Sequence, residues 1–366
     1  MSGVALAENQ NPEGQVTIVG SNMETLNPLL SESSYETTVL NGIFSRLVYI
    51  DDKGNYFADL AKEVPSIKNG GISEDGLVYT FHLREDAKWH DGESVTAEDV
   101  KYTWEMIMND KVAVVSRDGF DEIERIETPD SHTVVMYKTK ATADWMLNWA
   151  QTGGSIIPKH VWESVPAVEF NKGHEYSRKP IGSGPFKFVK WIPGSYFVME
   201  ANKDYYGEGP YLNKVIYKEV ESPINQLSML QTGEADVALN LEGKQLEQIK
   251  NIDRLNVSLN PASIYVHMTF NLDNPVFKDK RTRQALSYAI PRDLIVEKIL
   301  NGVGVPAATS TSPIHWAYNE ELKPYPFNME KAKKLLSDAG WHDVDNDGIL
   351  ENGDLKFEFT LYTNAG

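Results

Sequence analysis

Cysteine is absent from this chain of 366 residues, which excludes disulfides, thiol catalysis and cysteine-ligated metal sites. Basic residues are also scarce: 35 lysines and arginines stand against 53 acidic residues, giving a net charge of −18. Because nucleic acids are bound mainly through lysine and arginine, this balance argues against a nucleic-acid partner. No run of 18 apolar residues occurs, so the sequence predicts no membrane-spanning helix.

The motifs of common enzyme classes are missing as well. The sequence has no GxxxxGK[ST] phosphate loop, no HExxH pair and no GxSxG elbow. Its eight histidines are scattered, and carboxylate pairs are expected by chance in so acidic a chain. We therefore predict that the protein is not an enzyme and carries no cofactor, apart from the metal considered below.

The N-terminus carries a weak export signal. Ala5-Leu6-Ala7 has the small-x-small pattern of a signal-peptidase site, although the basic and apolar regions expected upstream are missing. One interpretation is the trimmed remnant of an export signal. The other is that Met1 stands where a lipidated cysteine begins the natural mature chain. Both predict an extracytoplasmic protein, in the periplasm or at the cell surface, the second with a lipid anchor.

Short strands and helices alternate along the whole chain. Residue alternation and turn signals predict strands at 16–20, 77–83, 185–191, 196–202, 214–220, 263–272 and 355–363, and a further strand after Gly233. Apolar periodicity and caps predict helices at 35–47, 96–108, 222–232, 280–290 and 329–339. In the second helix Thr96 and Asp99 approximate a capping box. The mixture predicts an α/β protein with more than one lobe.

Four stretches carry a resemblance to a known family. They are "YTFHLREDAKWHDGESVTAEDVKYTWE" (79–105), "PIGSGPFKFVKW" (180–191) continued by "MEANKDYYGEGPYLNKVIYK" (199–218), "TFNLDNPVFKDKRTRQALSYAIPRDLIVEKILNG" (269–302) and "MEKAKKLLSDAGW" (329–341). In content and order they resemble the family 5 extracellular solute-binding proteins, the receptors of oligopeptide and dipeptide ABC importers. The resemblance covers the chain from about residue 16 to its end.

The resemblance implies a two-lobed, periplasmic-binding-protein-like fold of the peptide-binding type. Domain I, the first ligand-binding lobe, is expected at 14–47 and 181–262, with the accessory domain II inserted at 48–180. Domain III, the second ligand-binding lobe, is expected at 263–366. Family members continue beyond the position of Gly366, so we expect the N-terminal part of a longer protein, with domain III truncated.

The resemblance also implies the function and its partners. Such receptors capture oligopeptides or dipeptides outside the cytoplasm, close on the extended ligand by a hinge motion, and deliver it to ABC permease subunits. The ligand backbone is held as an added strand, while roomy pockets accept varied side chains. The same fold serves other solutes, namely nickel chelates, haem, glutathione and oligosaccharides, which remain the alternative ligands.

Candidate ligand contacts come from two segments. By its offset from "LNP", the family's contacting edge corresponds to "SESSYE" (31–36), from which Glu32 and Ser34, with Ser33 beside them, are carried over as ligand-binding residues. The alternative is a polar loop that precedes a helix. Tyr265 and His267 share one face of the predicted 263–272 strand, where domains I and III would meet, and an aromatic ring with a polar tip suits a cleft wall. A structural role is the alternative for both.

The stretch "DVDNDGILENGD" (343–354) has the spacing of a calcium loop. Calcium takes six to eight oxygen ligands, here predicted from Asp343, Asp345, Asp347, the Ile349 carbonyl and Asp354 at loop positions 1, 3, 5, 7 and 12. Glu351 would act through water at position 9. The predicted strand that follows means that this is not a complete EF-hand. A metal-free surface turn is the alternative.

Two other classes of protein remain as rivals. The aspartate loop would suit a calcium-dependent adhesion or scaffold module, in which folding of the chain depends on calcium. A secreted hydrolase would be recognised by turnover of peptides. The sequence favours the solute-binding protein over both, because four stretches in the expected order support it.

Overall fold

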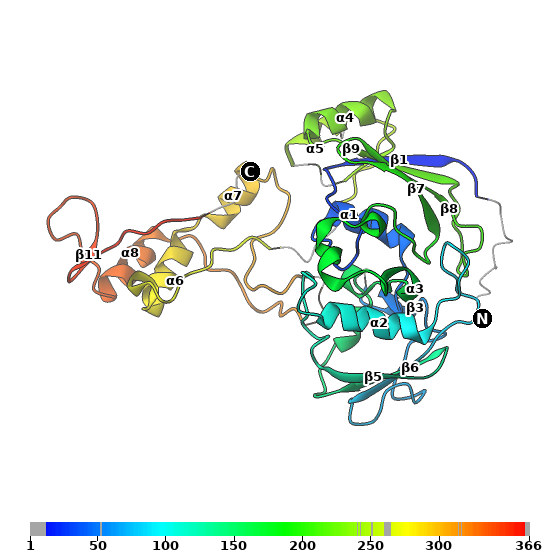
Figure 1. Ribbon diagram of the computed structural model, residues 1–366. Coiled ribbons are helices and arrows are strands. Elements are labelled where there is room, and N and C mark those ends of the chain that lie inside the picture. The colour runs from blue at the N-terminus through cyan, green and yellow to red at the C-terminus, as the bar shows by residue number, and fades with distance from the viewer. Residues whose placement is uncertain are drawn as a thin grey trace, which may run out of the picture. The chain divides into compact units, whose positions relative to one another are not determined.

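The computed structural model describes residues 12–51, 53–239, 241, 243–249, 252–259, 265–313, 315 and 317–362, without the side chains of residues 172, 246 and 247. Ala5–Ala7, on which the export-signal prediction rests, lie outside the described residues, as do residues 263, 264 and 363 of two predicted strands. The chain forms two compact units, residues 1–241 and residues 242–366 (Figure 1).

The helices of both units are short. The α-helices are α1 (Ser34–Ile43), α2 (Ala97–Met108), α3 (Lys159–Trp162), α4 (Pro223–Thr232), α5 (Gly243–Ile249), α6 (Lys280–Ala289), α7 (Arg292–Lys298) and α8 (Met329–Asp338). The 3-10 helices are η1 (Trp145–Trp149), η2 (Thr152–Gly154), η3 (Ala167–Lys172), η4 (Glu175–Ser177) and η5 (Pro275–Phe277). Among the described residues, none of these helices is long and apolar enough to cross a membrane.

The strands lie mostly in the first unit. They are β1 (Gln15–Gly20), β2 (Val48–Ile50), β3 (Tyr56–Ala58), β4 (Val78–His82), β5 (Ile123–Asp130), β6 (Thr133–Lys138), β7 (Phe186–Ile192), β8 (Tyr196–Ala201), β9 (Lys214–Glu219), β10 (Val237–Ala238), β11 (Glu351–Asn352) and β12 (Leu355–Lys356). Only β11 and β12 belong to the second unit as described.

A five-stranded mixed sheet joins distant parts of the first unit, in the order β10-β1-β9-β8-β7 (Figure 1). β1 pairs in parallel with β9 on one side and with β10 on the other, whereas β7, β8 and β9 form an antiparallel meander. The sheet therefore combines residues 15–20 with residues 186–238. The sequence between these two regions forms a separate three-stranded antiparallel sheet, β4-β6-β5, and the β2-β3 hairpin.

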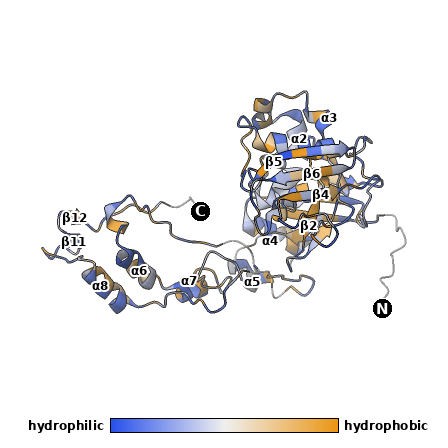
Figure 2. Ribbon diagram, turned by 90° about the horizontal axis from the view of Figure 1, so that it is seen from below, coloured by the Kyte–Doolittle hydropathy of each residue, from blue (hydrophilic) through white to orange (hydrophobic). Residues whose placement is uncertain are grey.

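A large hydrophobic core joins most elements of the described part of the first unit. Buried side chains of β4 and β6 alternate with outward-facing ones, and Phe81, Val134 and Met136 are almost completely buried. Figure 2 shows the hydrophobic colour concentrated on these strands. The same core continues through Trp89 and α1 to Tyr217 of the five-stranded sheet. The division into domains I, II and III remains a prediction, and the two compact units divide at Leu241–Glu242.

Most elements with local sequence signals occur where they are predicted. The capping box of α2 is present, since the Asp99 carboxylate accepts the Thr96 backbone N–H at 2.8 Å. Helix α4 ends at Gly233, whose φ of 81° suits glycine, and β10 follows it. The Asn328 side chain caps α8 by accepting the Lys331 N–H at 2.9 Å, and Gly340 follows the end of that helix.

Helix α1 is shorter than predicted and ends at Ile43 rather than near residue 47. The reason is a close approach of two backbone segments. The Ile43 carbonyl accepts the Gly184 N–H at 2.8 Å, and a Cβ added at Gly184 would lie 2.7 Å from the Gly42 carbonyl oxygen. A Cβ added at Gly182 would overlap the Ile43 carbonyl oxygen itself. Glycine is therefore required where the chain returns to the five-stranded sheet.

His90 holds the same segment from its other side. Its Nδ1 accepts the Gly182 N–H at 3.2 Å, so in the neutral ring the proton lies on Nε2, which donates to the Gly184 carbonyl at 3.1 Å. The His90 N–H also donates to the Gly182 carbonyl at 2.8 Å. Burial lowers the pKa of His90 to about 4, against the raising effect of the Gly184 bond. The neutral imidazole is thus part of the fold.

The second unit has a small core built by α6, α8 and η5. Helices α6 and α8 pack through Ala285, Tyr288 and Ala332. A neighbouring cluster contains Val276, Phe277 and Trp341. Helix α7 buries none of its side chains among the described residues.

Two predicted strands of this unit are wrong as far as the structure describes them. Residues 265–272 are irregular instead of continuing a strand from 263, and of 355–363 only Leu355–Lys356 form a strand, β12. A strand needs a neighbour for its backbone N–H and C=O groups. Within residues 265–313, 315 and 317–362 the only ladder is the two-residue pairing of β11 with β12.

The geometry of His90 predicts a pH-dependent stability of the first unit. The pKa of His90 is about 4 in the folded protein, below the ordinary value of 6.5. As the pH falls, His90 is therefore protonated in the unfolded chain before it is protonated in the folded one. The contribution of neutral His90 is complete above pH 6.5 and is lost as the pH falls towards 4. At about 1.4 kcal/mol per pKa unit, we expect the free energy of unfolding to fall by about 2 kcal/mol between pH 7 and pH 5.

Urea unfolding followed by tryptophan fluorescence at both pH values tests this expectation. The variant His90→Gln keeps a donor and an acceptor but does not titrate. Its free energy of unfolding should therefore lose only the pH-dependent contribution of His90. His82→Gln, at an exposed histidine in β4 of the same unit, is the matched control. Equal pH dependence in the wild type and in His90→Gln would contradict the assignment.

Candidate functional site

The carboxyl ends of three parallel strands meet at one edge of the five-stranded sheet. β1 ends at Gly20, β9 at Glu219 and β10 at Ala238, and all three run in the same direction. In open α/β sheets, ligands commonly bind outside the carboxyl ends of such strands. The segment that leads from β1 to α1 begins at this edge and contains Glu32 and Ser33, and Ser34 begins the helix.

Ser33 has an identified structural role. It is the N-cap of α1: its Oγ accepts the Tyr35 N–H at 3.1 Å, and its carbonyl accepts the Thr37 N–H at 3.0 Å. Ser34 is the first residue of the helix, and its carbonyl accepts the Thr38 hydroxyl at 2.9 Å. Glu32 and Ser34 are exposed. The predicted segment is therefore a polar loop fixed to a helix start, a description that fits both its ligand-binding and its structural interpretation.

Two residues that support this segment, Glu36 and Tyr35, were not predicted from the sequence. Glu36 is 2% exposed, and its Oε1 accepts the N–H groups of Glu24 and Thr25 at 2.7 and 3.0 Å. The Tyr35 ring packs so closely on Gly20 that a Cβ there would lie 2.7 Å from Tyr35 Cδ1. These contacts hold the loop between β1 and α1 from inside. The local signal for Glu36 was its position as the third residue of the helix, three residues after the Ser33 cap.

The hydroxyl of Tyr217 completes this inner layer. It donates to the Ser21 carbonyl at 2.8 Å. Burial first, and then the neighbouring Tyr35, Glu219 and Glu221, raise the pKa of Tyr217, so its hydroxyl stays protonated and remains a donor. Glu219 in turn accepts the Trp191 Nε1–H at 2.6 Å and the Gly194 N–H at 2.9 Å. The strand ends are thus fixed by satisfied hydrogen bonds.

Tyr265 and His267 lie together in the second unit. Their rings stack with centroids 4.6 Å apart and an interplanar angle of 26°, and the Tyr265 side chain is 42% exposed. The spacing of two residues puts both rings on one side although the backbone is irregular. The pair offers a flat aromatic surface with a hydroxyl and ring nitrogens at its edges, which suits contact with a ligand backbone or ring.

The aspartate loop gathers three carboxylates. Those of Asp343, Asp345 and Glu351 offer oxygens that all lie within 4.8 Å of one another. Asp347 and Asp354 do not join this group as described. The Asp347 carboxylate instead accepts the Ile349 N–H at 2.7 Å, which lowers the pKa of Asp347, with a further contribution from Lys356.

Glu351 enters the group because an antiparallel bridge pairs it with His342, the residue before Asp343: the His342 N–H donates to the Glu351 carbonyl at 2.9 Å, and the Glu351 N–H donates to the His342 carbonyl at 2.7 Å. One of its oxygens, Oε2, accepts the Val344 N–H at 3.0 Å. The other, Oε1, is buried and has no hydrogen-bond partner among the described residues. Water or a cation would satisfy that oxygen.

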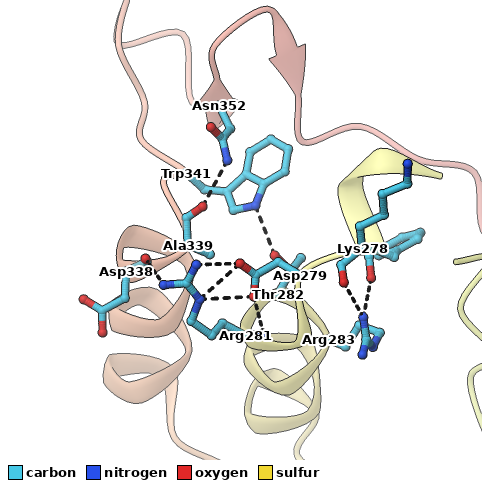
Figure 3. Close-up of polar contacts among 10 residues, drawn as sticks. Lys278, Asp279, Arg281, Thr282, Arg283, Asp338, Ala339, Trp341 and Asn352 are labelled. Carbon is cyan, nitrogen blue, oxygen red and sulfur yellow. Dashed lines mark hydrogen bonds and ion pairs between the residues drawn. The ribbon is translucent and has the colours of Figure 1, made fainter. Parts of the chain in front are cut away.

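Figure 3 shows how the aspartate loop is attached to the helix pair. The Trp341 indole N–H donates to the Thr282 hydroxyl at 3.1 Å, and the Asn352 side chain donates to the Ala339 carbonyl at 3.0 Å. The Arg281 guanidinium binds the Asp279 carboxylate and the Asp338 carbonyl. The loop is therefore held at both ends to α6 and α8.

Residues 55–366 match the family described as bacterial extracellular solute-binding proteins, family 5 Middle. The chain belongs to this family. The oligopeptide-binding protein AppA of Bacillus subtilis (strain 168) is 32% identical over 358 residues, which are 97% of this chain and 64% of that protein. The glutathione-binding protein GsiB of Pectobacterium atrosepticum is 28% identical, over 89% of this chain and 61% of its own length.

Solved structures agree with the fold prediction. AppA from Bacillus subtilis in complex with a nonapeptide matches with a TM-score of 0.80 and 30% identity, over 95% of this chain and 68% of that one. NikZ from Campylobacter jejuni in complex with Ni(L-His) matches with a TM-score of 0.81 and 30% identity, over 95% and 67% of the two chains. The mixed α/β, peptide-binding type of fold is therefore confirmed, as is the resemblance to family 5 receptors.

The cap on α1 predicts that Ser33 contributes to stability whatever it binds. Loss of an N-cap hydroxyl costs about 1 kcal/mol. We expect Ser33→Ala to lower the free energy of unfolding of the first unit by that amount in urea denaturation. Ser34→Ala, one position into the helix, should change it much less. Equal stability of Ser33→Ala and the wild type would show that the cap contributes nothing.

Proposed function

We propose that this chain belongs to a receptor that captures oligopeptides or dipeptides outside the cytoplasm and delivers them to the permease subunits of an ABC importer. Membership of the solute-binding family carries this proposal. AppA, named as an oligopeptide-binding protein, is the relative that supports a peptide ligand. The chain spans 64% of AppA's length, so ligand and partners are proposed for the whole protein.

In the proposed mechanism, the extended ligand lies against Glu32, Ser33 and Ser34 on one lobe and against Tyr265 and His267 on the other. Backbone pairing gives affinity that does not depend on the ligand's side chains. The seryl hydroxyls act as donors or acceptors, and the stacked aromatic pair forms an apolar wall with polar edges. Hinge closure then buries the ligand. The inner contacts of Glu36 and Tyr217 keep the first segment in place.

Binding without catalysis completes the proposal. The receptor would release its ligand unchanged, so we propose that the protein is not an enzyme. We also propose a location in the periplasm or at the cell surface, with a lipid anchor as the alternative interpretation of the N-terminus. Among other ligands, Ni(L-His) and glutathione are the best supported, because NikZ is described in complex with the first and GsiB is named for the second.

Native mass spectrometry with a mixed peptide library tests the function directly. We expect adducts that fragment into amino acids. Tyr265→Ala and His267→Ala should each raise the Kd of the bound peptide about fivefold, which corresponds to a loss of about 1 kcal/mol of binding free energy per aromatic contact. Tyr211→Ala, at a 62% exposed tyrosine of the first unit, is the matched control.

Each alternative result has a defined meaning. Binding of Ni(L-His) or glutathione without any peptide adduct would replace the ligand class and keep the receptor function. Peptide binding that none of the site variants changes would reject the residues. Turnover of library peptides would support the hydrolase instead. Glu32→Gln should also weaken peptide binding, and Glu74→Gln, at an exposed glutamate of the first unit, is its control for loss of charge.

We also propose that the aspartate loop binds one calcium ion that pins the loop to α6 and α8. Asp343, Asp345 and Glu351 would supply carboxylate oxygens, with the Ile349 carbonyl, Asp347 and Asp354 completing the predicted set. The close approach of three carboxylates and the unpartnered Glu351 Oε1 support this proposal. Calcium would add charge compensation that three neighbouring carboxylates lack.

Calcium titration followed by thermal unfolding tests the loop. Calcium should raise the unfolding temperature of the second unit, because a ligand that binds only the folded state stabilises it. Glu351→Gln should remove the increase, whereas Glu358→Gln, at an exposed glutamate of the same unit, should keep it. No effect of calcium in the millimolar range would leave the loop as a turn. Unfolding of the whole chain by EDTA would favour the scaffold module.

A further inference from the structure

Four asparagines of this chain are followed by glycine: Asn41, Asn69, Asn301 and Asn352. In such a pair the glycine nitrogen can attack the side-chain Cγ of asparagine. The new N–Cγ bond forms a succinimide, the Cγ–Nδ2 bond breaks, and ammonia leaves with the proton of the glycine N–H. One water molecule then opens the ring to aspartate or isoaspartate. Glycine favours the attack because no Cβ hinders the approach.

Three of the four side chains are held by hydrogen bonds. Asn41 lies in α1, and its Oδ1 accepts from the Arg46 guanidinium. The Asn69 Oδ1 accepts the Ser66 N–H at 2.8 Å, and its Nδ2 donates to the Val64 carbonyl at 3.0 Å.

Asn352 lies in β11 and donates to the Ala339 carbonyl at 3.0 Å. Its amide also packs on Gly340, where an added Cβ would lie 3.1 Å from Asn352 Nδ2. For all three asparagines, attack on Cγ requires breaking these contacts, because the side-chain amide must first rotate towards the following nitrogen.

Asn301 differs from the others. Its side chain is exposed and makes no hydrogen bond within the described residues. It lies just after α7, with φ of 51°, and Gly302 follows with φ of 79°. One contact opposes reaction, since the Gly302 N–H donates to the Val296 carbonyl at 2.9 Å.

The bond that protects Gly302 belongs to a weakly held element. Helix α7 has seven residues and buries none of its side chains among those described. Leu294 and Ile299, which would anchor an amphipathic helix, are 51% and 71% exposed. Segments with few buried contacts open locally at low free-energy cost. Local opening of α7 therefore releases the Gly302 nitrogen at low cost, while the Asn301 amide is already free to turn.

We propose that Asn301 is the primary site of spontaneous deamidation in this protein. The product places a carboxylate just beyond the C-terminal end of α7, where the helix dipole disfavours negative charge. The isoaspartate form also lengthens the backbone of the turn by one methylene. Both changes weaken the helix end further, so the modification acts on the least anchored helix of the second unit.

Peptide mapping by mass spectrometry on the full chain tests the proposal. The folded protein and a urea-unfolded sample are incubated side by side at mildly alkaline pH, and conversion of amide to acid is measured at all four asparagines. We expect Asn301 to convert several-fold faster than the other three in the folded protein. In urea the four rates should approach one another, because the protecting contacts are lost.

Three results would overturn the proposal. Faster conversion at Asn69, Asn352 or Asn41 in the folded protein would assign the site elsewhere. Protection of all four in the folded protein would show that the Gly302 bond suffices. If Asn301 still deamidates faster than the other three asparagines in urea, its rate is set by the neighbouring sequence and not by the structure. Asn301→Gln serves to verify the assigned signal, and Asn301→Asp should lower the unfolding temperature of the second unit slightly.

Discussion

The close approach of Gly182 and Gly184 to the end of α1 is the contact on which the first unit depends. No side chain fits at Gly182, and the Gly184 N–H bonds to the last carbonyl of the helix. On the other side, the two ring nitrogens of His90 form hydrogen bonds with the backbone of both glycines. The contact sets the end of α1, the start of β7 and the position of the loop after β4. A larger residue here would displace all three together.

The same helix connects this contact to the candidate ligand segment. The C-terminal end of α1 is fixed by glycines, and its N-terminal end by the Ser33 cap. Between them, Glu36 uses its buried carboxylate to bind the loop that leaves β1. A binding segment needs to keep its shape when it is empty, since ordering it on binding would lower affinity. Rigid support at both ends of α1 meets that need.

Sequence reasoning predicted the elements whose signals are local. The signals for the α2 capping box, the Gly233 stop and the Asn328 cap each lie within a few residues of sequence. All three features occur in the structure. Elements that need a distant partner were harder. The alternation around Tyr265 has the period of a strand, yet the described part of that segment has no neighbouring strand.

The candidate site shows the same division. The motif indicates Asp343 and Asp345 as neighbours in one loop, but Glu351 joins them through its backbone bridge to His342. Glu36 and Tyr217 support the ligand segment through contacts that no spacing in the sequence indicates. Family resemblance, in contrast, identified fold and class because it draws on four separated stretches at once.

The pairing of β1 with β9 and β10 also decides the order in which the first unit can fold. β1 is made first, but both of its neighbours in the sheet lie near the far end of the unit. Contacts this remote in sequence slow folding, because the chain between them must be ordered before they form. In the β4-β6-β5 sheet the paired strands are closer in the sequence, with Val78 opposite Tyr137, so this sheet can form earlier. β1 is then among the last strands of this unit to be paired, and until that moment its apolar residues need protection from aggregation.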